Sequence, residues 1–145
     1  MKVLLIGQAP GRGGDPSRPL LGGRVGSKLI SMLGISEREY VRRFDRINAL
    51  NFWPGKNGKG DRFPMREARK IALRKLNVIS GRRILFVGIA AANAFGFDHA
   101  LLRWRRFNGG RAAILPHPSG VNRWWNDLIN RQNARRFMRR VAHLR

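Results

Sequence analysis

One short segment holds most of the side chains in this sequence that could do chemistry. Residues 115–126 read LPHPSGVNRWWN and set a histidine, a serine, an asparagine, an arginine and two tryptophans around two prolines. Proline fixes φ and removes a backbone donor, so a rigid loop is predicted after the apolar run of residues 111–115. A histidine in such a loop can donate a hydrogen bond to an oxygen that gains negative charge. An ordinary structural hydrogen bond for His117, with one tryptophan in the core, is the alternative interpretation.

Net charge indicates the class of partner. The 145 residues include 30 Lys+Arg and only 8 Asp+Glu, which gives a net charge of +22. Such a chain attracts polyanions over long distances, and nucleic acid is the natural partner. A membrane surface is the weaker alternative, because no apolar run approaches the ~18 residues that a spanning helix needs. Repulsion between copies favours a monomer, and a cytoplasmic, nucleoid-associated protein is expected.

Several common kinds of site are disfavoured. The chain has no cysteine, which excludes disulfides and thiolate metal sites. His99, His117 and His143 lie far apart in the sequence, so no zinc site is expected. The glycine-rich residues 7–14 match neither a P-loop nor a clean dinucleotide motif, so no cofactor is expected. Ser119 lacks the G-x-S-x-G turn of a hydrolase nucleophile.

Short apolar runs alternate with helical patterns along the chain. Strands are predicted at residues 3–6, 44–50, 83–87 and 111–115. Helices are predicted at residues 24–33, 37–43, 65–76, 90–94 and 126–144, with long loops at residues 8–23 and 51–64. This alternation predicts one α/β domain over residues 1–145, a three-layer αβα sandwich with a central four-stranded parallel sheet.

The last predicted helix is rich in arginine. Its possible apolar stripe consists of Leu128, Phe137, Val141 and Leu144. Its basic residues include Arg131, Arg135, Arg136, Arg139 and Arg140. Because few acids are available to pair with them, the helix is predicted either to follow DNA phosphates or to present a solvated basic face.

Three polar segments follow predicted strands. They are residues 7–14, 48–51 and 117–125, and sites in open α/β sheets form where the carboxyl ends of strands meet. The amide of Asn48 has both a donor and an acceptor, as recognition of a pyrimidine edge requires, although it could instead cap the strand end. Arg123 and Trp124 could enter a DNA groove and fill the gap left by an extruded base.

Together these segments resemble the uracil-DNA glycosylase superfamily. Residues 7–11 (GQAPG) are similar to its first motif, G-[EQ]-x-P-[GY]. Residues 17–29 (SRPLLGGRVGSKL) resemble the GRPFVGRAGxLL stretch of the bacterial and archaeal iron–sulfur branch, and Asn48 occupies the position of its strand-borne asparagine. Residues 117–123 (HPSGVNR) are intermediate between the H-P-S form and the N-P-S-G-[LV]-[SN]-R form of mismatch-type enzymes. The motif order agrees over nearly the whole chain.

The resemblance implies a monofunctional DNA glycosylase without a cofactor. Such an enzyme flips a pyrimidine out of DNA and hydrolyses its N-glycosidic bond, which leaves an abasic site. The N-glycosidic bond breaks before water attacks, so negative charge develops on the base. Catalysis therefore depends on a hydrogen-bond donor placed at the pyrimidine O2. By position, His117 is that donor, Asn48 binds the base edge and Gln8 helps to place the water.

The resemblance also implies two sets of binding residues. The base pocket would comprise Gly7, Ala9, Pro10, Gly11, Leu20 and Asn48. The DNA contacts would comprise Arg24, Lys28, Ser119, Gly120, Asn122, Arg123 and Trp124. Among these, Ser119 would hold a phosphate, while Arg123 and Trp124 would form the wedge.

Three positions depart from the family pattern, besides the missing iron–sulfur cysteines. Ala9 replaces the Asp or Asn that activates water in some branches, although the iron–sulfur branch is also non-polar there. Leu20 replaces the phenylalanine that would stack on the base. Gly11 replaces the tyrosine that excludes a 5-methyl group in the strictest uracil enzymes. The predicted substrate is therefore uracil or a 5-modified pyrimidine such as a phage modified cytosine, in base excision repair or anti-phage defence.

Two other functions fit the composition. The first is a non-catalytic, strongly basic DNA-binding protein on the same fold, for which Ala9 and Leu20 would be signs of lost chemistry. The second is a basic RNA-binding or ribosome-associated protein, whose adjacent tryptophans would stack on unpaired bases.

Overall fold

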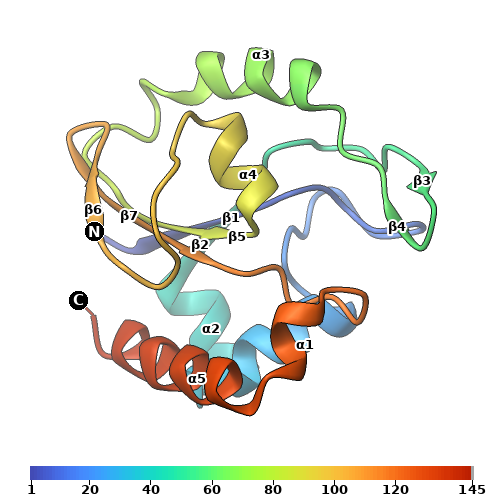
Figure 1. Ribbon diagram of the computed structural model, residues 1–145. Helices are drawn as coiled ribbons and strands as arrows, with labels where there is room; N and C mark the ends of the chain where they lie inside the picture. Colours follow the sequence, from blue (N-terminus) through green and yellow to red (C-terminus); the bar gives the residue numbers. More distant parts are fainter. Residues whose placement is uncertain (145) are drawn as a thin grey trace.

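The computed structural model describes residues 1–144 as a layered α/β fold (Figure 1). Its central sheet has the strand order β2-β1-β5-β7-β6. Four strands are mutually parallel, namely β1 (Val3–Gly7), β2 (Phe44–Asn48), β5 (Arg83–Val87) and β7 (Gly110–Leu115). A fifth, β6 (Arg105–Phe107), pairs antiparallel with β7 at the edge. The predicted fold class is confirmed, with five strands in place of four.

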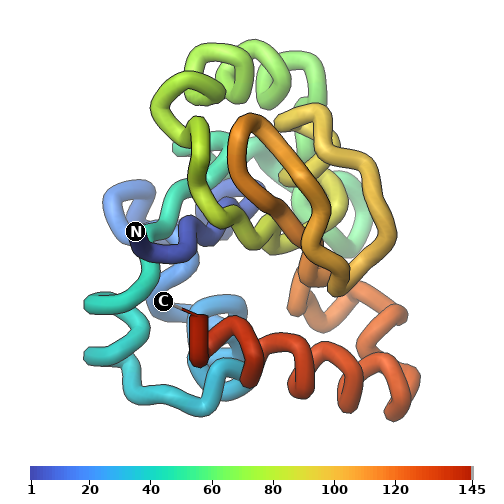
Figure 2. The backbone as a smooth tube through the Cα atoms, turned by 90° about the vertical axis from the view of Figure 1, so that its left-hand side faces the viewer, coloured from blue at the N-terminus to red at the C-terminus, as the bar shows by residue number. Residues whose placement is uncertain are grey.

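Helices cover both faces of this sheet (Figures 1 and 2). One face carries α1 (Gly23–Leu33), α2 (Glu37–Arg43) and α5 (Leu128–Ala142), and the other carries α3 (Met65–Lys75) and α4 (Ile89–Ala94). Side chains of a strand alternate between the two faces. Accordingly Leu5 packs in the core under α1, α2 and α5, whereas Leu4 and Ile6 pack in the core under α3 and α4.

Local sequence signals set the ends of α1 and α2, which match the predicted ranges 24–33 and 37–43 to within one residue. Gly34 ends α1 with a left-handed φ of 71°, and its N–H donates to the carbonyls of Ile30 and Ser31. The hydroxyl of Ser36 accepts a hydrogen bond from the backbone N–H of Glu39 at 3.1 Å and so begins α2.

The start of the last helix differs from the prediction. It was expected at Asn126, but that residue closes a 3₁₀ turn, η1 (Arg123–Asn126). The carboxylate of Asp127 accepts from the N–H groups of Ile129 and Asn130 and caps α5, so the helix begins at Leu128. The predicted apolar stripe is wrong at Leu128, which lies at the first position of the helix and is 58% exposed.

A short hairpin interrupts the loop predicted for residues 51–64. It consists of β3 (Lys56–Asn57) and β4 (Gly60–Asp61). Figure 1 shows the hairpin beside the edge of the sheet where β1, β2, β5 and β7 end, whereas the N-terminus and the end of α5 lie at the opposite edge. None of the helices within residues 1–144 is long and apolar enough to cross a membrane.

Candidate active site

Segments from three distant parts of the chain meet where the parallel strands end. They enclose a cavity of about 420 Å³, here called the strand-end cavity. Its lining comes from residues 8–15, residues 18–25, Asn48 and His117. The structure thus brings together the three segments that the sequence placed at strand ends. Gly7, which was also predicted to form the base pocket, is not among the lining residues; it pairs with Asn48 across β1 and β2.

Asn48 lines this cavity and carries an acceptor that has no hydrogen-bond partner within residues 1–144. The residue is 8% exposed, and its side-chain Oδ1 is buried without a hydrogen-bond partner among residues 1–144. Its backbone carbonyl accepts from Nζ of Lys75 on α3 at 3.1 Å, which fixes the strand end. Because buried polar atoms are almost always paired, the unpaired Oδ1 needs a partner from outside these residues, which water or a ligand donor can supply.

Gly7 makes the approach of Asn48 to the cavity possible. A Cβ at Gly7 would lie 2.5 Å from Oδ1 of Asn48 and 2.6 Å from Cδ2 of Leu20. Both distances are shorter than any real contact, so only glycine lets these two side chains approach the end of β1.

Leu20 is held over the cavity in a strained backbone conformation. Its φ is 55°, a left-handed value that leucine rarely adopts. The hydroxyl of Tyr40 on α2 donates to the Leu20 carbonyl at 2.8 Å, and Tyr40 is fully buried. Burial raises the pKa of Tyr40 well above its usual value, so the phenol stays protonated and remains a donor. Sequence reasoning missed Tyr40, because this contact joins residues twenty positions apart.

Removal of the Tyr40 hydroxyl should destabilise the fold. In Tyr40→Phe the half-buried Leu20 loses the donor to its carbonyl, and loss of such a hydrogen bond costs about 0.5–1.5 kcal/mol. We expect a lower urea midpoint with an unchanged slope, measured by equilibrium unfolding. An unchanged midpoint would show that Leu20 keeps its conformation without this hydrogen bond.

His117 lies in a loop that is fixed by hydrogen bonds between its own residues. Its backbone carbonyl accepts from Nδ2 of Asn122 at 3.0 Å and from Nε1 of Trp125 at 2.8 Å. Pro116 and Pro118 on either side are buried. Burial lowers the pKa of His117; the charge of Lys28 lowers it further, whereas Asp61 opposes the shift. The imidazole is therefore neutral at neutral pH and retains one N–H donor.

The other predicted residues of this loop divide between internal and exposed positions. Oδ1 of Asn122 accepts from the backbone N–H of Trp124 at 3.1 Å, so its amide is used within the loop. Trp124 is half-buried and packs against the core under α1 and α5. Gly120 and Arg123 are exposed, and Ser119 is half-buried beside a neighbouring groove.

Gln8 is packed in the cavity wall against a second glycine. A Cβ at Gly88, which follows β5 with a φ of 113°, would lie 2.4 Å from Nε2 of Gln8. The absence of a side chain there admits the Gln8 amide, which lines both the strand-end cavity and the neighbouring groove.

The neighbouring groove, here called the hairpin groove, has a volume of about 810 Å³. It shares Gln8, Arg24 and His117 with the strand-end cavity and adds Asp61 and Phe63 from the hairpin region. Sequence reasoning did not include this hairpin in the site. Gly58, with a φ of 66° at the first position of the turn, was a usable signal, because glycine at that position is typical of tight hairpins.

The cations of the chain are largely unneutralised. Only two ion pairs occur within residues 1–144, Arg43 with Glu39 at 3.7 Å and Arg82 with Asp45 at 2.6 Å. The exposed residues outside these pairs include Arg24, Lys28, Arg131, Arg135, Arg136, Arg139 and Arg140. The outer surfaces of α1 and α5 are therefore strongly positive.

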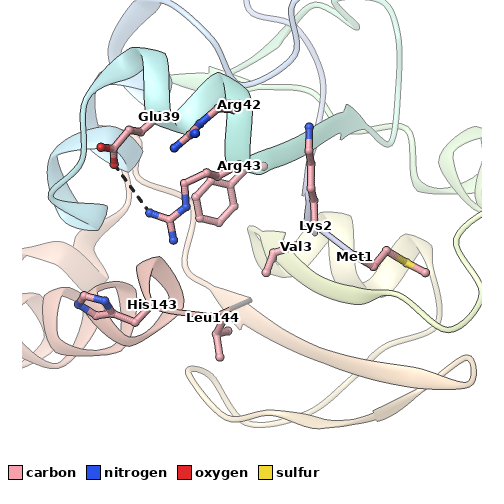
Figure 3. Close-up of a pocket in the computed structure, with 9 residues that line it drawn as sticks. Met1, Lys2, Val3, Glu39, Arg42, Arg43, His143 and Leu144 are labelled. Carbon is pink, nitrogen blue, oxygen red and sulfur yellow. Dashed lines mark ion pairs between the residues drawn. The ribbon is translucent and has the colours of Figure 1, made fainter.

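A separate cavity of about 660 Å³ lies at the opposite edge of the sheet, around Met1, Arg42 and His143 (Figure 3). Figure 3 shows the Arg43–Glu39 ion pair in its wall. This cavity contains none of the predicted site residues. Within residues 1–144 no cluster of three or more His, Asp or Glu side chains is placed to hold a metal ion.

Fold and site define an α/β protein with a pocket at the carboxyl ends of its parallel strands and a basic surface. The loop of residues 116–126, here called the histidine loop, lies at the edge of this pocket. The family model of the uracil DNA glycosylase superfamily matches residues 1–144, and the chain belongs to that superfamily. The resemblance seen in the sequence motifs is thereby confirmed. Members of the superfamily are generally DNA glycosylases, and membership implies DNA binding. No curated protein matches the chain.

Proposed function

We propose that the protein is a monofunctional DNA glycosylase that flips a pyrimidine into the strand-end cavity and hydrolyses its N-glycosidic bond. The observation that carries this proposal is that Asn48, whose Oδ1 has no hydrogen-bond partner within residues 1–144, lines the same cavity as His117. Uracil, thymine and cytosine each present an N–H donor on the edge that such an acceptor would bind. Family membership supplies the reaction class.

The reaction needs no covalent intermediate. As the bond between the sugar C1′ and the base N1 breaks, its electron pair moves onto the base and negative charge develops at O2. The neutral His117 imidazole donates to O2 and stabilises that charge. Water then adds to C1′, and the proton that it loses passes through solvent to the anionic base. The products are the free base and an abasic sugar, and the backbone phosphates help to stabilise the positive sugar.

The open wall of the cavity at Gly11 favours a substrate that carries a bulky 5-substituent. A Cβ at Gly11 would meet nothing within 4 Å, so this part of the wall is open. Gly11 occupies the position where the strictest uracil enzymes have a tyrosine. Leu20 offers an apolar side chain where those relatives stack a phenylalanine ring on the base. We propose a 5-modified pyrimidine, such as a phage modified cytosine, as the preferred base, with roles in anti-phage defence or base excision repair.

Residues of the loop around His117 and of α1 would hold the DNA backbone. In the proposed complex the hydroxyl of Ser119 and the backbone at Gly120 bind a phosphate. Arg24 and Lys28 follow the same strand along α1. Arg123 enters the duplex where the base has left, while Trp124, which is half-buried and packed against the core, supports the wedge.

The test is base release from duplex oligonucleotides that carry one uracil, thymine mispair, 5-hydroxymethylcytosine or glucosylated cytosine, followed by alkaline strand cleavage. Cleavage of the 5-substituted bases at a higher rate than uracil is the expected result. Efficient cleavage of uracil alone would contradict the proposed substrate but retain the glycosylase. Absence of cleavage with every base would overturn the function.

Base release should be insensitive to pH from neutral to moderately alkaline conditions. Because burial lowers the pKa of His117, the neutral donor persists at neutral pH and above, and protonation occurs only below the usual value of about 6.5. We expect single-turnover rates that are level above neutrality and change only in more acidic buffer. A rate that rises on acidification from pH 8 to pH 6 would show that imidazolium is the active form.

A non-catalytic DNA-binding protein remains the second candidate. The observation that favours it is the wall beside His117, where Ala9 offers no polar side chain and the Gln8 amide is packed against Gly88. A catalytically inactive protein would bind all the test duplexes with equal, salt-sensitive affinity and release no base.

A further inference from the structure

A cleft between α1 and α5 is separate from the strand-end cavity and the hairpin groove. This α1–α5 cleft has a volume of about 300 Å³. Met32 of α1 and Pro118 and Trp125 of the histidine loop form its uncharged walls, and no described acidic residue lines it. Apolar walls with a few polar groups are typical of pockets for small organic groups, and the volume is at the lower end of their range of about 300–1,000 Å³.

Three cations surround this apolar cleft. Lys28 comes from α1, and Arg131 and Arg135 come from α5. Arg131 also donates to the Trp125 carbonyl at 2.9 Å, which ties the helix to the loop. Neither Lys28 nor Arg135 takes part in an ion pair within residues 1–144. An apolar slot with an aromatic wall and a cationic rim complements a flat ring that carries an anionic group, as a nucleotide does.

The cleft adjoins the strand-end cavity, because neighbouring residues of the same two segments line both. His117 lines the cavity, and the next residue, Pro118, lines the cleft. On α1, Arg24 lines the cavity and Lys28 lines the cleft, four residues or about 6 Å further along the helix. A DNA strand that runs along α1 with one base in the cavity would therefore bring a neighbouring nucleotide to the cleft.

We propose that the α1–α5 cleft is a second nucleotide site, which takes an unpaired DNA base against Trp125, Met32 and Pro118 with an adjoining phosphate on Lys28 and Arg135. A second copy of the chain is a poor occupant, because two molecules of charge +22 repel each other. Contacts between bases and aromatic side chains are tolerant of sequence, so the site accepts any base. It gives the protein a preference for DNA that is unpaired beside the flipped nucleotide.

The test uses two probes of equal length, an eight-nucleotide thymidine oligomer and the same oligomer with tetrahydrofuran in place of every base. Ser31→Trp fills the cleft, because Ser31 is exposed and lines it. Ser27→Trp is the matched control, since Ser27 is an exposed serine one turn earlier on α1 and does not line the cleft.

Ser31→Trp is expected to weaken binding of the thymidine oligomer about tenfold, the effect of one base contact, and to leave the baseless oligomer unchanged. Ser27→Trp is expected to leave both affinities unchanged. Equal affinities of the two variants for the thymidine oligomer would overturn the proposal. So would an equal loss for both probes, which would indicate a surface for phosphates alone.

A second pair of variants covers the case in which Ser31→Trp lowers thermal stability. Arg135→Gln removes a cation at the cleft, and Arg140→Gln removes an exposed cation of the same helix outside it. We expect the larger loss of affinity from Arg135→Gln, and equal losses would contradict the site. A change in sedimentation on filling the cleft would assign it to self-association instead. Neither probe contains a damaged base, so the result can be read even if no base release is found.

Discussion

Replacement of His117 by alanine should lower the single-turnover rate of base release by about 10²–10³-fold, the effect of losing one donor to a developing oxyanion. Affinity for DNA should be retained, because the imidazole lowers the energy of the transition state and holds no phosphate. The rate is measured on a duplex that carries the preferred base, with enzyme in excess, and the Kd is measured on the same duplex at fixed ionic strength.

His143→Ala is the matched control for this experiment. His143 is an exposed histidine at the end of α5, at the opposite edge of the sheet. It should release the base at the rate of the unmodified protein. Equal rates for both alanine variants would remove His117 from the chemistry. A parallel loss of rate and affinity in His117→Ala would mean that the residue acts in DNA binding.

Gly7→Ala is expected to have the second largest effect. The added Cβ would lie 2.5 Å from Oδ1 of Asn48 and 2.6 Å from Cδ2 of Leu20, so both side chains must leave their positions. A displacement of about 1 Å in a site can cost about 10²-fold in rate. Crowding of the buried strand end should also lower the free energy of unfolding by about 1–3 kcal/mol. Single-turnover rates and urea unfolding measure the two effects.

Gly11→Ala controls for the loss of a glycine from the same segment. A Cβ at Gly11 meets nothing within 4 Å, so the free energy of unfolding should stay close to that of the unmodified protein. A Gly7→Ala protein that releases the base at full rate would show that neither Asn48 nor Leu20 needs its observed position.

Local patterns in the sequence were sufficient to predict the main elements of the fold but not its hairpins. The apolar run of β5 and the caps at Gly34 and Ser36 each depend on a few neighbouring residues. The strand β6 is short, charged and exposed at two of its three positions, so it carries no apolar signal. Its turn was readable, because Asn108-Gly109, with φ values of 48° and 78°, is the residue pair that tight hairpins favour.

Prediction of the candidate site depended on a simple geometric rule. The carboxyl ends of parallel strands meet at one edge, so Asn48 and His117 could be placed near each other without a structure. The contacts that hold the site residues in place at that edge could not be predicted by this rule. The hydrogen bond from Tyr40 to Leu20 and the steric need for Gly88 beside Gln8 are contacts across distant segments, set only by packing.

The scarcity of ion pairs within residues 1–144 gives dissolved salt two opposite effects on this protein. Counterions that gather around the unpaired arginines of α1 and α5 reduce the strain of crowding like charges into one compact chain, and so favour the folded state. The same counterions must be expelled when DNA binds, so they weaken the complex. No single salt concentration can therefore maximise both the stability of the fold and the affinity for DNA. Bound DNA itself neutralises the arginines, so it stabilises the folded chain without added salt.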